Sequence, residues 1–130
     1  MVVLIVDDDH EDCELFHEAI HDIDPAIKCW TARDGRHALN ILTKELILLP
    51  DYIFLDINMP LMNGRDTLVE IKKNTRLRDI PVIMYSTTSD TKEIQGYYKL
   101  GAHDFLIKPN NFNKLVEALT SIIISTRTSK

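Results

Sequence analysis

The stretch Val2-Val3-Leu4-Ile5-Val6-Asp7-Asp8 decides the fold, because an unbroken apolar run ends there in two adjacent carboxylates. Three later runs follow the same plan: Tyr52-Ile53-Phe54-Leu55 ends at Asp56, Val82-Ile83-Met84-Tyr85 ends at Ser86, and Phe105-Leu106-Ile107 ends at Lys108. Near-continuous apolar runs of this length predict strands that are buried on both faces of a parallel sheet.

The polar residues that end these runs predict a single chemical site. In open parallel α/β sheets, ligands bind outside the carboxyl ends of the strands. Strands running the same way would bring carboxylates, a hydroxyl and an ammonium group to one edge, from Asp7, Asp8, Asp56, Ser86 and Lys108. That collection of groups suits a divalent cation and a phosphoryl group.

Segments with helical periodicity separate the apolar runs, and this alternation is typical of a doubly wound α/β sheet. The first expected helix covers residues 11–23. The second follows Asp34, which could cap it, and includes Leu46. The third begins near Gly64, the fourth is capped by Ser89 or Asp90, and the fifth begins near Asn111.

The order of the strands follows from which of them tolerate polar residues. The short strand expected at 26–31 carries Lys28 in its middle, so it belongs at an edge of the sheet. His103-Asp104 marks the other edge, at the start of the last strand. A five-stranded parallel (βα)5 sandwich with the strand order 2-1-3-4-5 satisfies both constraints.

The composition bounds the class of protein. The chain has 130 residues, 45% hydrophobic and 27% charged, which predicts one globular domain. The net charge of −5 disfavours nucleic acid as a partner. No apolar stretch approaches the roughly 20 residues of a membrane span, and no leader is recognisable, so we expect a cytoplasmic protein. Cys13 and Cys29 are too few for a disulfide framework or a zinc site, and we expect reduced thiols.

In its motifs the chain resembles the receiver domains of response regulators. The matching motifs are Val6-Asp7-Asp8, Leu55-Asp56-Ile57-Asn58-Met59-Pro60 with Asn63-Gly64, Pro81-Val82-Ile83-Met84-Tyr85-Ser86, and Lys108-Pro109. The resemblance runs from Val2 to about Ile124 and implies the flavodoxin-like fold of chemotaxis receivers. It implies a receiver domain over residues 1–124, with a short polar tail at 125–130 and no output domain.

The resemblance also implies a role for each residue of the site. Asp56 would accept a phosphoryl group from a kinase phosphohistidine. Asp8, Asp56 and the backbone carbonyl of Asn58 would bind Mg2+ directly, and Asp7 would bind it through water. Lys108 would pair with the phosphoryl oxygens and balance their charge.

Two neighbours of these motifs carry further expectations. Asp9 follows the acidic pair, and we interpret it as a capping or solvated residue and not as a metal ligand. Pro109 is a candidate for a cis peptide bond, because an X-Pro bond can adopt the cis form at modest cost and so aim the side chain of Lys108.

Ser86 and Phe105 are the residues that the resemblance implies as a switch. The serine hydroxyl would turn onto a phosphoryl oxygen, and the aromatic ring would rotate into the space vacated. The face built from the fourth helix, the fifth strand and the fifth helix would then bind partners. Its candidates are Tyr97, Tyr98, Phe105 and Ile124, since adjacent tyrosines on one helix cannot both point into the core.

The function implied by the resemblance is that of a stand-alone phosphoacceptor switch in a two-component phosphorelay, and not an enzyme. The expected partner is a sensor histidine kinase or a phosphotransfer protein, with homodimerisation as a further option. The segments 76–81 and 86–89 resemble those of small regulators paired with phytochrome-type histidine kinases.

Three other functions stay open at this point. A magnesium-dependent phosphohydrolase with an aspartyl intermediate would need a second acid where Asn58 stands. A flavin-binding module would need a Ser/Thr-rich phosphate loop after the first strand. A degenerate receiver would bind partners without phosphorylation, which the intact acidic set disfavours.

Overall fold

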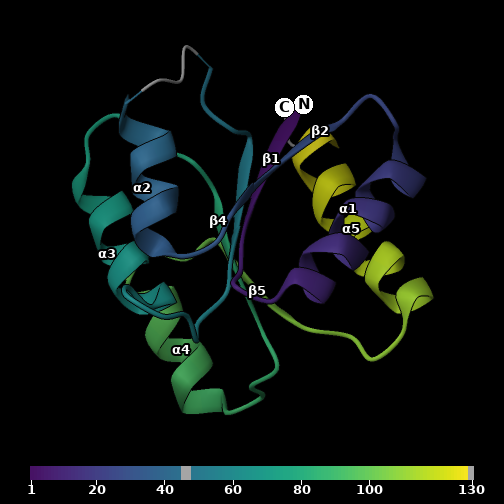
Figure 1. The fold of residues 1–130 in the computed structure, drawn as a ribbon. Helices are drawn as coiled ribbons and strands as arrows, with labels where there is room; N and C mark the ends of the chain where they lie inside the picture. Colours follow the sequence, from purple (N-terminus) through teal and green to yellow (C-terminus); the bar gives the residue numbers. More distant parts are fainter. Residues whose placement is uncertain (45–47, 129–130) are drawn as a thin grey trace.

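The computed structural model describes residues 1–44 and 48–128, in which strands and helices alternate regularly. Their bounds in chain order are β1 (Val2–Val6), α1 (His10–Ile23), β2 (Lys28–Ala32), α2 (Gly35–Lys44), β3 (Tyr52–Leu55), α3 (Gly64–Lys73), β4 (Val82–Ser86), α4 (Thr91–Lys99), β5 (Asp104–Ile107) and α5 (Phe112–Thr128). The strands form one parallel sheet of order β2-β1-β3-β4-β5, so the predicted fold is confirmed (Figure 1).

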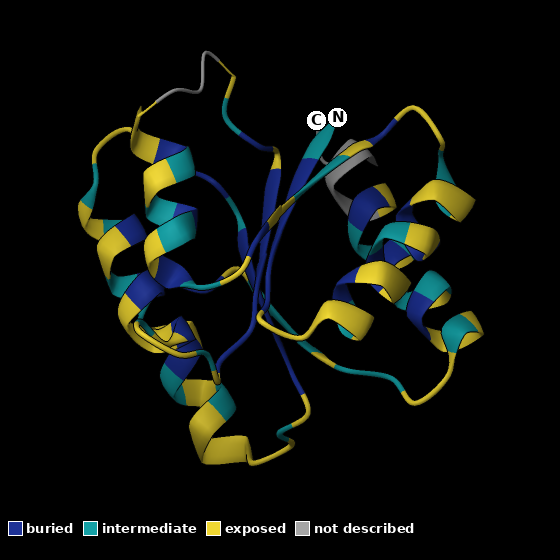
Figure 2. Ribbon diagram, in the orientation of Figure 1, coloured by how far each residue is buried: buried dark blue, intermediate teal, exposed yellow. Residues whose placement is uncertain are grey.

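Helices cover both faces of this sheet. The helices α2, α3 and α4 lie on one face, and α1 and α5 lie on the other (Figure 1). Leu4 and Val6 of β1 pack toward the first group of helices, whereas Val3 and Ile5 pack toward the second. The central strands β1, β3 and β4 are therefore buried apart from Val2 at the start of β1 (Figure 2), which explains why they are unbroken apolar runs.

The edge strands have the mixed pattern that was predicted from their polar residues. Lys28 of β2 is exposed, and β5 carries half-buried residues ending in the exposed Ile107. Because an edge strand has a partner on only one side, it can hold polar side chains without burying them.

Short polar side chains fix the starts of the helices. Asp9 accepts a hydrogen bond from the backbone N–H of Asp12 at 3.0 Å, so the capping interpretation of Asp9 is confirmed. Asp34 caps α2, and Asp90, the second of the two predicted alternatives, caps α4. Each such cap stabilises its helix by about 1 kcal/mol.

Helix α5 runs to Thr128 and so extends into the segment 125–130 that is expected to be a short polar tail. The division into a receiver domain over 1–124 and a tail stays a prediction. The segment 112–128 contains no glycine or proline, which agrees with one continuous helix. Leu46, expected in the second helix, and residues 129–130 lie outside the described residues.

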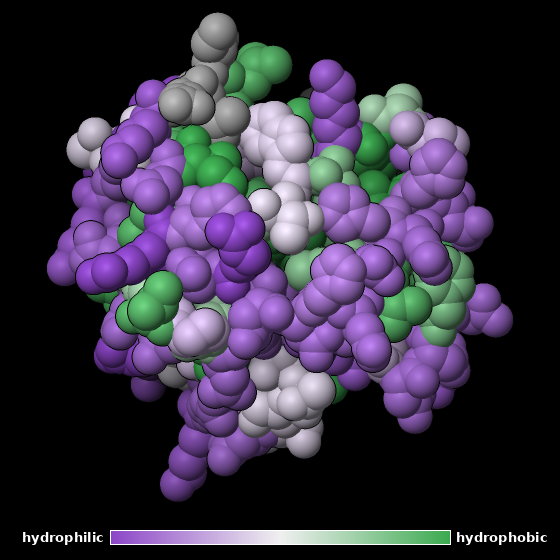
Figure 3. All heavy atoms as spheres, in the orientation of Figure 1, coloured by the Kyte–Doolittle hydropathy of each residue, from purple (hydrophilic) through white to green (hydrophobic). Residues whose placement is uncertain are grey.

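The surface is mostly hydrophilic on the face drawn in Figure 3, where apolar groups form small separate areas. Among the described residues, no helix is long and apolar enough to cross a membrane.

Gly64 lets α3 begin directly against the end of β3. Its backbone N–H donates to the carbonyl oxygen of Ile57 at 2.8 Å. A Cβ atom at this position would collide with the carbonyl oxygen of Asp56 and would lie 2.8 Å from the Cα of Ile57. The close approach of these two segments therefore requires glycine and helps to fix the backbone that carries Asp56.

We expect Gly64→Ala to lower the free energy of unfolding by about 1–3 kcal/mol, because backbone atoms on both sides must move apart. Urea denaturation measures this change. Gly96→Ala is the matched control: a Cβ at Gly96, inside α4, would meet no atom within 4 Å. The control should stabilise the protein by about 0.5–1 kcal/mol. Changes of the same sign in both variants would contradict this explanation.

Candidate metal centre and its lysine

The carboxyl edge of the sheet carries the site, and backbone hydrogen bonds hold its residues there. The N–H of Asp56 donates to the carbonyl oxygen of Val6 at 2.9 Å, which joins the ends of β3 and β1. The N–H of Lys108 donates to the carbonyl oxygen of Ser86 at 2.7 Å, which joins the ends of β5 and β4. The ends of four strands thus meet as the sequence predicted.

Three carboxylates meet at this edge, from Asp7, Asp8 and Asp56. One oxygen of each lies within 4.8 Å of the others, and among the described residues this is the set of acidic, histidine or cysteine groups that could hold a metal ion. Asp7 and Asp56 are only 2% and 6% exposed, whereas Asp8 is exposed. Like charges this close repel by on the order of 1 kcal/mol or more per pair even in partly screened surroundings, so the cluster needs a cation.

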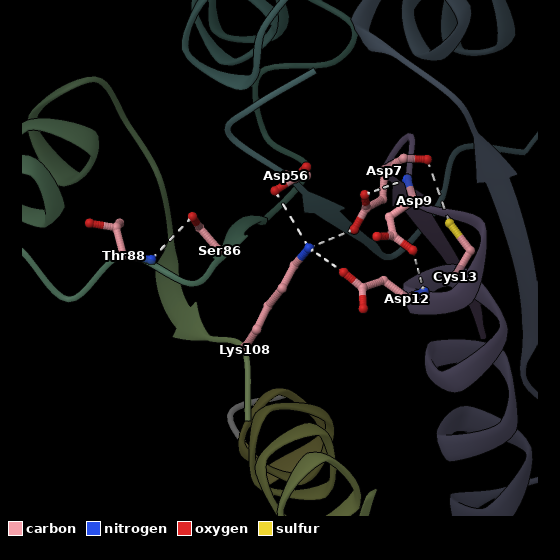
Figure 4. Close-up of polar contacts among 8 residues, drawn as sticks. All are labelled: Asp7, Asp9, Asp12, Cys13, Asp56, Ser86, Thr88 and Lys108. Atoms are coloured by element: carbon pink, nitrogen blue, oxygen red, sulfur yellow. Dashed lines mark hydrogen bonds and ion pairs between the residues drawn. The ribbon is translucent and has the colours of Figure 1, made fainter. Parts of the chain in front are cut away.

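Lys108 supplies part of that positive charge. Its Nζ donates to Asp7 Oδ2 at 2.9 Å and to Asp12 Oδ2 at 2.8 Å, and it lies 3.6 Å from Asp56 Oδ1 (Figure 4). Asp7 and Lys108 are 101 positions apart in the sequence, so this contact links the first strand to the last.

The pKa values of the two central groups reflect these contacts. Burial, and next the charge of Asp7, raises the pKa of Asp56 to about 6, although Lys108 pulls it down. Burial alone would lower the pKa of Lys108, but its hydrogen bonds to Asp12 and Asp7 outweigh that effect and raise it above its usual value. Lys108 is therefore charged at neutral pH.

The donor set fits Mg2+ by its chemistry. Magnesium binds carboxylate oxygens and keeps several waters, which the exposed position of Asp8 permits. Asp7 already uses both oxygens, since Oδ1 accepts from the N–H of Asp9 at 3.0 Å and Oδ2 accepts from Lys108. This favours a role for Asp7 through water. Asn58 is exposed in the loop after β3, and its carbonyl ligand stays a prediction.

Sequence reasoning missed Asp12 and Tyr85. Asp12 lies in the first turn of α1 and makes the shortest contact to Lys108. The sequence feature that could have identified Asp12 is its position four residues after Asp8, at the start of a helix that begins at the same edge of the sheet. Tyr85 is buried under Lys108, whose Nζ lies 5.0 Å from the ring centroid in a cation–π contact. Burial raises the pKa of Tyr85 to about 12.

Cys13 supports the backbone of the site without taking part in its chemistry. Its thiol donates to the carbonyl oxygen of Asp7 at 3.5 Å, and burial raises its pKa to about 12. The thiol is therefore protonated at neutral pH. Cys13 and Cys29 are both free, as expected.

The switch candidates lie at the same edge and just beside it. Ser86 is buried, and its Oγ accepts a hydrogen bond from the N–H of Thr88 at 3.4 Å (Figure 4). Phe105 is half-buried, with its ring centroid 6.0 Å from that of Tyr97. The pair forms a packed contact between β5 and α4.

The two adjacent tyrosines point in different directions. Tyr98 is 44% exposed, and its hydroxyl donates to Asp104 Oδ1 at 3.0 Å. Tyr97 is only 7% exposed and belongs to the core, so its assignment to the exposed partner face is wrong. Successive helical residues point about 100° apart, and only one of the two can face the sheet. Ile124 is exposed, as that face requires.

The peptide bond before Pro109 is trans. No bond in the described ranges is cis, so the cis candidate is corrected. The trans form is favoured by about 0.5–1 kcal/mol before proline, and Lys108 reaches its carboxylate partners without isomerisation.

The fold and the acid–lysine edge define a receiver domain, and the comparison with protein families agrees. The family model described as "Response regulator receiver domain" matches residues 3–120. The chain belongs to this family, and so it is a response-regulator receiver of two-component phosphorelay signalling.

Several relatives cover nearly the whole chain. Response regulator Rcp1 of Synechocystis sp. is 31% identical over 134 aligned residues, which cover 98% of this chain and 91% of the relative. The crystal structure of the phosphorylated cyanobacterial phytochrome response regulator RcpA is similar at 31% identity and a TM-score of 0.84, covering 93% of this chain and 89% of that one. The Mn2+-bound form of Rcp1 is similar at 30% identity and a TM-score of 0.81, covering 93% and 90%.

The raised pKa of Asp56 predicts a pH-dependent stability for the metal-free protein. The pKa rises from 3.8 to about 6, so the folded state binds this proton more tightly than the unfolded chain does. This contribution stabilises the fold below about pH 4 and is lost as the pH rises through about 6. Asp56→Asn removes the charge, and we expect it to raise the free energy of unfolding at pH 7.5 by about 1–3 kcal/mol.

Urea denaturation without metal, at pH 7.5 and at pH 4.5, measures this difference. The gain of Asp56→Asn over the unsubstituted protein should shrink at the lower pH. The exposed Asp22→Asn in α1 serves as the control and should show no such trend. A gain that is the same at both pH values would contradict the assignment of the raised pKa to Asp56.

Proposed function

We propose that Asp56 accepts a phosphoryl group from the phosphohistidine of a sensor histidine kinase or a phosphotransfer protein. The observation that carries this proposal is the environment of one carboxylate. An oxygen of Asp56 lies within 4.8 Å of oxygens of Asp7 and Asp8, with which it could hold a metal ion. Its Oδ1 lies 3.6 Å from the Nζ of Lys108. The carboxylate of Asp56 can therefore attack a phosphorus atom while Lys108 and a bound divalent ion would neutralise the phosphoryl oxygens.

The transfer exchanges one bond for another. A carboxylate oxygen of Asp56 attacks phosphorus, a P–O bond forms, and the P–N bond to the histidine breaks with its electron pair leaving on the imidazole nitrogen. With a pKa of about 6, Asp56 is mostly ionised at neutral pH and ready to attack. Lys108 is the donor placed to hold a phosphoryl oxygen.

The residues that would hold Mg2+ are Asp8, Asp56 and the carbonyl of Asn58, with Asp7 acting through water. The bound ion would neutralise negative charge on the phosphoryl oxygens as they approach the carboxylates. The Mn2+-bound form of the relative Rcp1 supports a divalent ion in this family.

The chain acts as a phosphoacceptor and not as a phosphohydrolase, in this proposal. A hydrolase of the aspartyl type needs a second carboxylic acid near the nucleophile, and Asn58 has no such proton to donate. The similarity to the phytochrome response regulator RcpA supports a phytochrome-type histidine kinase as the partner.

We expect Asp56→Asn to abolish labelling by acetyl phosphate with Mg2+, because the amide is not a nucleophile toward phosphorus. Intact mass spectrometry measures the added phosphoryl mass. Asp79→Asn, an exposed acid in the turn before β4, is the control and should label like the unsubstituted protein. Label that persists on Asp56→Asn and maps to Asp7 or Asp8 would overturn the choice of Asp56.

The phosphoryl group would act on the α4-β5-α5 face, through Ser86 and Phe105. The hydroxyl of Ser86 would leave the N–H of Thr88 for a phosphoryl oxygen, which loosens the loop before α4. Phe105 packs on Tyr97, so a rotation of its ring changes how α4 sits on β5. This face presents the exposed side chains of Tyr98, Ile107 and Ile124 to a kinase, a target or a second copy of the chain.

Amide hydrogen exchange with and without beryllofluoride, a mimic of the phosphoryl group, tests this route. We expect altered protection in α4, β5 and the loop 87–90, because Ser86 and Phe105 would move. Asp56→Asn treated in the same way is the control and should show no response. Protection changes confined to α1 and α2 would contradict the proposal.

A further inference from the structure

The ammonium group of Lys108 donates hydrogen bonds to two carboxylates, neither of which is the phosphoryl acceptor of the proposed transfer. Two of its three N–H groups donate to Asp7 and Asp12, and the 2.8 Å contact with Asp12 is the shorter. Asp56 lies at 3.6 Å, beyond hydrogen-bonding distance. In this state the lysine is therefore held by Asp12 and Asp7, and not by the carboxylate that would be phosphorylated.

Asp12 differs from the other acids around Lys108 in its position. It does not belong to the close group of Asp7, Asp8 and Asp56 that could share a cation. Its side chain is 34% exposed and comes from α1, while the other acids follow strands. A cation bound by the close group would weaken the hold of Asp7 on Lys108 but would leave the ion pair between Lys108 and Asp12 largely intact.

We infer that Asp12 is a positioning residue that competes with the phosphoryl oxygens for the ammonium of Lys108, and so limits the affinity of the site for a phosphoryl group. The inference rests on the proposed function of Asp56. Asp12 would lower the affinity for a phosphoryl group in two ways. It occupies one N–H of the lysine, and its negative charge repels an incoming phosphoryl dianion.

Beryllofluoride binding with excess Mg2+, measured by isothermal titration calorimetry, tests this inference. We expect Asp12→Asn to bind beryllofluoride roughly three- to five-fold more tightly than the unsubstituted protein, the size expected for one partly exposed ion pair. A variant that merely damaged α1 would bind more weakly, so the expected direction separates competition from a structural role.

Two further variants isolate the contact with Lys108. Glu11→Gln removes the same charge from the neighbouring, exposed position in the first turn of α1, and it should change the affinity by less than Asp12→Asn does. Asp12→Glu keeps the carboxylate and should return the affinity toward that of the unsubstituted protein. The side-chain 15N resonance of Lys108 in metal-free protein should shift in Asp12→Asn and not in Glu11→Gln.

The outcomes separate the two proposals. If the unsubstituted protein neither binds beryllofluoride nor labels with acetyl phosphate, the proposed function of the site fails. If it does both, and Asp12→Asn binds no more tightly than Glu11→Gln, Asp12 acts only through bulk charge and the inference is overturned. Weaker binding by Asp12→Asn would also overturn it, because Asp12 would then orient Lys108 toward the phosphoryl group.

Discussion

The repulsion among the carboxylates at the end of the sheet is the constraint on which the rest of the structure depends. Asp7 and Asp56 are buried there at a distance that two free carboxylates would avoid. The ammonium of Lys108 offsets part of this repulsion, and a divalent ion would offset more. The close fit of Gly64 against Asp56 and the thiol of Cys13 under Asp7 keep the backbone from relaxing away. The scaffold therefore holds a charge arrangement that favours the arrival of a cation.

Two contacts lead from the charged edge of the sheet toward α4. Ser86 ends β4 beside the site, and its hydroxyl is hydrogen-bonded to the loop that leads into α4. Phe105 and Tyr97 then join β5 to α4 by ring contact. The loop and this aromatic pair are the two contacts through which we propose that a change of charge at the site reaches α4.

The sequence predicted those features that depend on local periodicity, and failed where the outcome depends on packing. Apolar runs are local, so the strands, their order and the meeting of Asp7, Asp56 and Lys108 followed from them. The contact of Asp12 depends on the rotation of α1 about its axis and on a side-chain rotamer, neither of which the sequence displays. The burial of Tyr97 has the same origin, since either tyrosine could have faced the sheet.

The contact between Lys108 and Asp7 joins segments 101 positions apart, and this separation has a consequence for the newly made protein. A ribosome-bound chain that has emerged only as far as β4 already contains the acids but lacks their lysine. Local opening of β5, an edge strand of half-buried and exposed residues, would recreate that situation in the finished protein. The neutralisation of the buried acids by Lys108 is thereby a property of the completed fold, and it is absent while the last strand is missing or detached.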